Sequence, residues 1–225
     1  MRPGDKVKAG SALMTDKNRP EIKFVSPVSG EVVAVNRGEK RKVLSIVVKP
    51  DAQIEYENFG KKNVSSLKAE EVKAELLNAG MWPFIKQRPY DIVASPSDSP
   101  RDIFVTAFNS APLAPNFDFL VKGNEADLQA GLDALAKLTN GKVYVGVKKG
   151  SSVKVNHVET IEFEGPHPVG NVGVQINHIK PVNKGELVWT VNATDVILMG
   201  RLFNKGVADF TRLVAITGSE TTEQG

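Results

Sequence analysis

The stretch DIFVTA, at residues 102–107, decides the fold class, because its apolar residues follow one another instead of alternating with polar ones. A strand with this pattern is usually buried on both faces, inside a sheet that helices cover. Further strands are expected at residues 142–147, 158–163, 187–191 and 213–216. Helices are expected between them at residues 125–138, 169–179 and 195–204. The alternation predicts a mostly parallel, three-layer α/β domain over residues 66–212.

The N-terminal residues predict a second, smaller module built from short strands. GDKVKAGSALM (residues 4–14) and FVSPVSGEV (residues 24–32) resemble the biotinyl/lipoyl-like β barrel-sandwich hybrid, which is expected over residues 1–50. Gly10 and Gly30 are expected at turns whose backbone conformation disfavours a Cβ. Lys17 lies near the hairpin where carrier domains place a modified lysine. It lacks the apolar flanks of a carrier motif, which favours a structural or docking module.

The segment between the two modules gives no sign of a nucleotide site. Residues 51–65 are polar and predict a linker, and Ser66 is expected to cap a helix over residues 67–79 that Gly80 ends. A Rossmann-like flavin or nucleotide site needs a glycine-rich turn whose N–H groups approach phosphates. After Gly80 the chain continues with MWPFI, and no GxGxxG or GxxxxGK[ST] motif occurs. A Rossmann-like domain without the glycine-rich flavin loop is typical of a scaffold.

Composition excludes several classes of chemistry. The 225 residues contain no cysteine, which excludes disulfides, a cysteine nucleophile and thiolate-ligated metal clusters within them. No apolar run is long enough to cross a bilayer, which predicts a soluble, cytoplasmic protein. The net charge of +3 is too small to indicate nucleic-acid binding. The three histidines, His157, His167 and His178, do not have the spacing of a metal site on one helix.

Two residues are candidates for a ligand pocket, and no catalytic residue is predicted. His167 lies in GPHPVG (residues 165–170), a rigid turn after an expected strand, where α/β proteins often bind ligands. Capping or packing within the loop is the alternative role. Asn109, which follows the strand at residues 102–107, is the other pocket candidate.

Two features are candidates for a docking surface. Arg37, Lys40, Arg41 and Lys42 form the densest basic cluster, which predicts either a solvated turn or a patch for an acidic partner or an anionic membrane. Trp82 is expected either on an exposed docking loop or in the α/β core.

Four stretches together resemble the A subunit of the bacterial sodium-translocating NADH:quinone oxidoreductase. They are SPVSGEVVAVNRGEKR (residues 26–41), FVTAFNSAPLA (104–114), GPHPVG (165–170) and DVILMGRLF (195–203). More distant resemblances are to the C subunit of Rnf electron-transport complexes and to the flavin-binding NADH subunit of respiratory complex I. Those two families carry a glycine-rich flavin loop after the Ala-Gly that matches Ala79–Gly80, and this chain lacks it.

The resemblance implies a non-catalytic, peripheral subunit on the cytoplasmic side of the bacterial inner membrane. Its partners would be the other subunits, especially the adjacent membrane subunit, and quinone. Flavins, an iron-sulfur centre and the NADH site would lie on other subunits, with no cofactor on this chain. Residues 213–225 would begin a β-grasp module or form a truncated end. Two alternatives remain: a flavin- and NADH-binding oxidoreductase domain of the Rnf type, and an isolated carrier or adaptor domain.

Overall fold

The computed structural model describes residues 1–222 and divides them into two compact units. Residues 223–225, the end of the expected final segment, lie outside the described residues. The first unit comprises Met1–Pro83 and Arg201–Phe210, and the second comprises Phe84–Gly200 and the residues from Thr211 onward. The domain boundaries expected at 1–50, 51–65, 66–212 and 213–225 stay a prediction.

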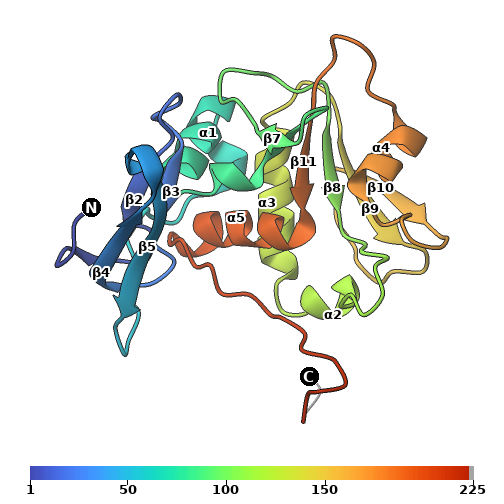
Figure 1. Cartoon of the computed structure of the whole chain (residues 1–225). Coiled ribbons are helices and arrows are strands. Elements are labelled where there is room, and N and C mark those ends of the chain that lie inside the picture. Colours follow the sequence, from blue (N-terminus) through green and yellow to red (C-terminus); the bar gives the residue numbers. More distant parts are fainter. Residues whose placement is uncertain (223–225) are drawn as a thin grey trace. The chain divides into compact units, whose positions relative to one another are not determined.

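Two small antiparallel sheets open the first unit (Figure 1). In one, β4 (Gly30–Arg37) lies between β1 (Lys6–Val7) and β5 (Val43–Pro50); in the other, β2 (Ala12–Thr15) pairs with β3 (Lys23–Val25). Val7, Ile22 and Val32 are buried among them. This arrangement agrees with the small strands that the turn glycines and spaced valines predict.

The β4 and β5 strands continue beyond the sheet that anchors them. β1 pairs only with Gly30 and Glu31, whereas β4 pairs with β5 along its whole length, as far as Arg37 and Val43. The 3-10 turn η1 (Glu39–Arg41) joins the two strands. We refer to residues 33–47, the two-stranded part beyond β1, as the β4–β5 arm.

The segment at residues 51–65 is hydrogen-bonded along its length within the first unit. The N–H of Ala9 donates to Glu55 O, and the N–H groups of Phe59 and Lys62 donate to the carbonyls of Gly206 and Phe203, all at 2.8–2.9 Å. The segment ends in the 3-10 turn η2 (Val64–Ser66), where Asn63 Oδ1 accepts from Ser65 N at 3.0 Å.

The helix α1 (Ala69–Asn78) begins two residues later than expected, and the prediction that Ser66 caps it is wrong. Ser66 Oγ donates to the carbonyl of Asn63, which keeps it in the preceding turn, and Lys68 holds the cap position. Glu71 Oε2 accepts from the N–H of Lys68 at 2.7 Å and so satisfies a donor at the helix start. Gly80, with φ +68°, ends the helix segment as predicted.

The second unit is built on a six-stranded sheet with the order β10-β9-β8-β11-β6-β7. The strands β8 (Ile103–Thr106), β9 (Val143–Lys148), β10 (Glu159–Phe163) and β11 (Val188–Asn192) pair in parallel, as the buried apolar runs predict. The antiparallel edge β6 (Lys86–Arg88) and β7 (Ile92–Val93) was not predicted, because its residues carry no strand pattern. The prediction of a strand at residues 213–216 is wrong, since this segment is irregular and exposed.

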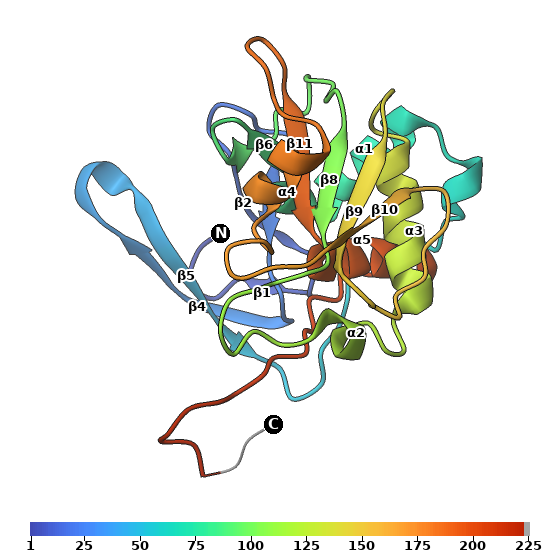
Figure 2. The same cartoon turned by 90° about the vertical axis from the view of Figure 1, so that its right-hand side faces the viewer.

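Helices cover both faces of this sheet (Figures 1 and 2). On one side α3 (Glu125–Ala136) and α5 (Ala193–Lys205) lie close together, because Gly131 and Gly200 leave no room for a Cβ against the opposite helix backbone. On the other side Ile176 of α4 (Val172–Ile179) packs on Phe104 and Val188. The short helix α2 (Phe117–Leu120) precedes α3. The three layers are those expected from the alternating pattern.

The helix α4 starts at Val172 and not at Val169 as expected. The residues before it form turns, in which the N–H of Val169 donates to Pro166 O and the N–H of Asn171 to Pro168 O.

None of the helices within residues 1–222 combines the length and the hydropathy that a bilayer crossing requires.

Gly30 is where the N-terminal sheets are most sensitive to substitution. Its φ is +155°, and a Cβ there would overlap the carbonyl oxygen of Lys49 on the paired strand. We expect Gly30→Val to lower the free energy of unfolding by about 1–3 kcal/mol, measured by urea denaturation. Gly4→Val is the matched control, because Gly4 also has a positive φ but nothing lies within 4 Å of its Cβ position. Equal losses for both variants would contradict a packing role for Gly30.

Candidate functional site

The carboxyl edge of the parallel strands brings the two predicted pocket residues together. In open α/β sheets, ligands bind in the loops that follow the carboxyl ends of the strands. The loop after β8 contains Asn109 and Ser110, and the loop between β10 and α4 contains His167 and Gly170. We call these two loops, residues 107–116 and 164–171, the carboxyl-edge site.

Ser110 links the two loops. Its Oγ lies 3.1 Å from Nδ1 of His167 and accepts a hydrogen bond from the N–H of Gly170 at 2.8 Å. Thr106, the last residue of β8, adds a second link, since its Oγ1 lies 3.3 Å from the carbonyl oxygen of Gly170. Gly170 is required here because a Cβ would overlap the backbone N of Ser110. Sequence reasoning missed Ser110, although it stands beside Asn109 after a buried strand.

The contact between Ser110 Oγ and His167 Nδ1 is compatible with two directions of the hydrogen bond, which depend on the tautomer of the ring. Ser110 Oγ accepts one hydrogen bond from the N–H of Gly170, and it can still donate its own proton to Nδ1 of His167. With Nδ1 as acceptor, Nε2 carries the ring proton and can donate to a ligand carbonyl. A serine nucleophile would instead bond Nε2 and leave Nδ1 for a carboxylate. The pair is therefore suited to hydrogen bonding and not to acyl transfer.

Asn109 shapes its loop rather than pairing with His167. Its Oδ1 accepts from the N–H of Ala111 at 3.0 Å, which closes a turn typical of asparagine. Its side chain is exposed. Asn109 and His167 thus lie in neighbouring loops, and their role in a ligand pocket stays a prediction.

A buried amide lies near the same end of the sheet. Gln175 of α4 is 2% exposed, and its Nε2 has no hydrogen-bond partner within the described part of the chain. A Cβ on Gly146 would overlap the Gln175 amide, so the glycine makes room for it. Gly146 stands in register with Thr106, which places the amide beside the last residue of β8. No sequence signal distinguished this glutamine from its neighbours.

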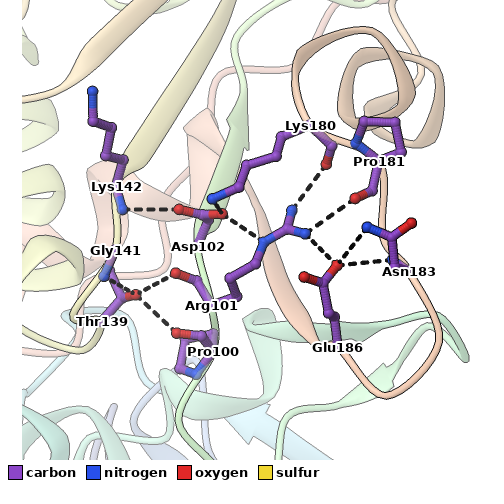
Figure 3. Close-up of polar contacts among 10 residues, drawn as sticks. All are labelled: Pro100, Arg101, Asp102, Thr139, Gly141, Lys142, Lys180, Pro181, Asn183 and Glu186. Atoms are coloured by element: carbon purple, nitrogen blue, oxygen red, sulfur yellow. Dashed lines mark hydrogen bonds and ion pairs between the residues drawn. The ribbon is translucent and has the colours of Figure 1, made fainter.

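The amino ends of the same strands are held by an ionic network around the buried Asp102 (Figure 3). Asp102, 1% exposed, accepts from Lys180 Nζ at 2.8 Å, Arg101 Nε at 2.7 Å and the N–H of Lys142 at 3.0 Å. The Arg101 guanidinium also donates to Glu186 and to the carbonyls of Lys180 and Pro181. These donors are used within the protein, so the network is a structural anchor.

The network keeps Asp102 charged. Burial alone would raise the pKa of the Asp102 carboxyl. The hydrogen bonds from Lys180, from the Lys142 N–H and from Arg101 outweigh burial and lower that pKa below its ordinary value.

The segment after Gly80 does not fit a flavin or nucleotide. A phosphate cradle needs exposed N–H groups on a glycine-rich turn before a helix. Here Met81 and Trp82 are fully buried and the chain forms the 3-10 turn η3 (Trp82–Phe84). Trp82 therefore fills the core, and its expected use on an exposed docking loop is wrong.

The remaining candidates do not assemble into a reactive site. Lys17 is exposed in the turn between β2 and β3, where Asp16 Oδ1 accepts from the N–H groups of Asn18 and Arg19 at 2.8 and 2.9 Å. His157 lies 3.4 Å from Asp133, and His178 is exposed on α4. Within residues 1–222, no three His, Asp or Glu side chains gather in a way that could hold a metal ion.

Comparison with known proteins connects both parts of the chain to one family. Residues 67–208 match the model of the NqrA second alpha/beta domain, and residues 1–51 match that of the NqrA N-terminal barrel-sandwich hybrid domain. The chain belongs to the NqrA family. The two NqrA models confirm the expected barrel-sandwich hybrid and α/β fold.

The chain is similar to the A subunits of the Na(+)-translocating NADH-quinone reductases of several bacteria. It is 37% identical to that of Yersinia pestis over 229 residues, 36% to that of Neisseria meningitidis serogroup B over 228, and 37% to that of Photorhabdus laumondii over 225. The matches cover 98–99% of this chain and 50–51% of those proteins. The chain thus spans about half the length of the curated NqrA relatives it matches.

Asp102 gives a test of the ionic anchor. Asp102→Asn keeps the shape but removes the charge, and we expect it to lower the free energy of unfolding at neutral pH by about 2–4 kcal/mol. Because the folded pKa lies below the ordinary value of 3.8, this contribution is present above about pH 4 and is lost as the pH falls through the folded pKa. Unfolding by urea at about pH 7 and about pH 3 should show the two proteins converging in acid.

Lys142→Met is the matched control for this experiment. It keeps the N–H that Asp102 accepts and removes only the exposed pair between Lys142 Nζ and Glu159. Because this pair is exposed to solvent, its removal should cost much less stability than Asp102→Asn. A larger cost for Lys142→Met than for Asp102→Asn would contradict the anchor.

Proposed function

We propose that this chain is a non-catalytic, peripheral subunit of a sodium-translocating NADH:quinone oxidoreductase, on the cytoplasmic side of the bacterial inner membrane. The observation that carries the proposal is the pair of NqrA matches, which extends over both parts of the chain. Flavins, the iron-sulfur centre and the NADH site would belong to other subunits. Its partners would be those subunits, above all the adjacent membrane subunit.

The proposed scaffold role is supported by the turn after Gly80, which is where the flavin-binding relatives would carry their glycine-rich loop. The turn after Gly80 is occupied by the buried Met81 and Trp82, so its backbone is not presented to a phosphate. This argues against the alternative of a flavin- and NADH-binding domain of the Rnf type. The isolated-carrier alternative accounts for residues 1–51 alone and leaves the second NqrA match without a role.

The carboxyl-edge site is the part of the chain best suited to contact a quinone. A quinone is recognised by hydrogen bonds to its two carbonyl oxygens, and Nε2 of His167 offers a donor in the tautomer in which Nδ1 accepts from Ser110. This role requires no electron transfer to or from the chain.

Co-purification tests the subunit role. We expect the affinity-tagged full-length protein, isolated in mild detergent from the membranes of its host, to carry NADH:quinone reductase activity and additional subunits with it. The same protein purified alone should show no flavin absorbance and no micromolar NADH isotherm. A stoichiometric flavin spectrum in the isolated chain would support the Rnf-type alternative, and recovery without any reductase activity would contradict the proposal.

His167 tests the quinone contact within that complex. Loss of one neutral hydrogen bond costs about 1 kcal/mol, so His167→Phe should raise the KM for quinone about fivefold and leave kcat nearly unchanged. NADH oxidation with an artificial acceptor should not change. His178→Phe is the matched control, since His178 is exposed on α4 outside the carboxyl-edge site. Equal KM values for the two variants would rule out the contact.

A further inference from the structure

The β4–β5 arm is a two-stranded ribbon that no third strand of the described chain joins. β1 pairs only at the base of β4, so residues 33–47 pair with each other alone. Figure 2 shows the arm (light blue) extending away from the other strands of its own unit, with η1 at its tip. A ribbon of this kind buries little of its own surface, which leaves its side chains available to another surface.

The tip of the arm is strongly basic and its charges are not neutralised within the described chain. Arg37, Lys40, Arg41 and Lys42 stand against the single carboxylate of Glu39, which gives residues 37–42 a net charge of +3. All five side chains are exposed. Arg37 donates to the carbonyl of Arg41 at 3.1 Å, and none of the four basic residues has an ion pair within residues 1–222. The net charge of this small cluster of long side chains therefore equals the net charge of the whole molecule.

The backbone at the tip is in a conformation that its residues do not favour. Lys40 and Arg41 have φ values of +52° and +61°, and the N–H of Lys42 donates to Glu39 O at 3.1 Å. Two consecutive positive φ values are typical of a hairpin turn that selects Asn-Gly. Backbone strain of this kind costs free energy and is concentrated at functional sites, which makes the tip a candidate for a function. The two residues with the unfavourable backbone are also two of the cations without an ion pair in the described chain.

Apolar side chains lie beside the cations instead of in the core. Leu44 is 64% exposed, Val33 45% and Val47 42%. Val33 and Leu44 both lie at irregularities of the β4–β5 register, where a bulge turns a side chain out of the regular alternation. The exposed leucine is two residues from Lys42, so cationic and apolar groups share the tip.

We propose that the β4–β5 arm binds the surface of an anionic lipid bilayer. The four cations would contact phosphate headgroups, and Leu44 would enter the boundary between headgroups and acyl chains. A fluid headgroup layer suits these cations, because within residues 1–222 no side-chain hydrogen bond holds Lys40, Arg41 or Lys42 in one geometry for a rigid protein carboxylate. The inference deepens the proposed function, because it names the surface that a peripheral subunit would contact. Only the identity of the membrane rests on the proposed function.

Vesicle binding tests the arm directly. The full-length protein is mixed with vesicles of phosphatidylcholine and phosphatidylglycerol, or of phosphatidylcholine alone, and the bound fraction is measured by sedimentation at several salt concentrations. We expect binding to the anionic vesicles only, weakening as salt rises. Since each basic residue near such a surface strengthens binding about fivefold, Lys40→Asn/Arg41→Gly should weaken it about 25-fold.

This double variant separates binding from folding. Asn and Gly are the residues that the turn prefers, so its melting temperature should equal or exceed that of the unchanged protein. Lys154→Asn/Lys184→Asn is the matched control, because it removes the same net charge from two exposed lysines of the second unit. The control should lose less than about threefold. Leu44→Ser should weaken binding at high salt as well as at low salt, since its contribution is apolar.

Four outcomes would overturn the inference. They are no binding to anionic vesicles, equal binding to neutral ones, an equal loss in the control pair, and a Lys40→Asn/Arg41→Gly variant that binds vesicles normally. If vesicles are not bound but this variant fails to co-purify with reductase activity, the arm docks on an acidic protein and the lipid assignment is wrong. Co-purification of the unchanged protein is scored separately, so the proposed function and this inference fail independently.

Discussion

The buried carboxylate of Asp102 is the interaction on which the second unit depends. It accepts hydrogen bonds from Arg101, from Lys180 and from the backbone of Lys142, while the backbone carbonyl of Asp102 accepts from the N–H of Trp189 at 3.1 Å. One residue therefore fixes the amino ends of β8, β9 and β11 against one another. A buried carboxylate is costly unless all its partners are in place, so the network specifies a single alignment of these strands.

That alignment determines the geometry at the opposite ends of the strands. With their amino ends held together, β8 and β9 run in register to Thr106 and Gly146. The loops that follow then lie close enough for Ser110 to bond both Gly170 and His167. The candidate site itself contributes few hydrogen bonds and is exposed at His167. Its order thus derives from the rigid sheet beneath it, as is usual for binding loops on a stable scaffold.

The sequence predicted those parts of the fold whose signals are local. Apolar runs identified β8 to β11, and turn glycines identified the barrel-sandwich strands. The prediction failed where other contacts decide: Ser66 is drawn into a turn by Asn63, and β6 exists because it pairs with β11. The site was predicted only in part for the same reason. His167 stood out in its proline-rich turn, but its bond to Ser110 joins residues 57 positions apart.

The backbone conformation agrees with the preference of the residue type at some turns of the first unit and conflicts with it at others. Gly30 has a positive φ and is the residue type that tolerates it, so its sequence and its backbone agree. Lys40 and Arg41 also adopt positive φ values, although neither is a residue type that tolerates this conformation well. Folding alone would favour Asn-Gly at this turn, and neither cation has an ion pair within the chain's described part to compensate. A conflict between local preference and structure is expected where side chains serve something outside the fold. This conflict at Lys40 and Arg41 supports the proposal that the β4–β5 arm of the first unit contacts a surface outside the protein.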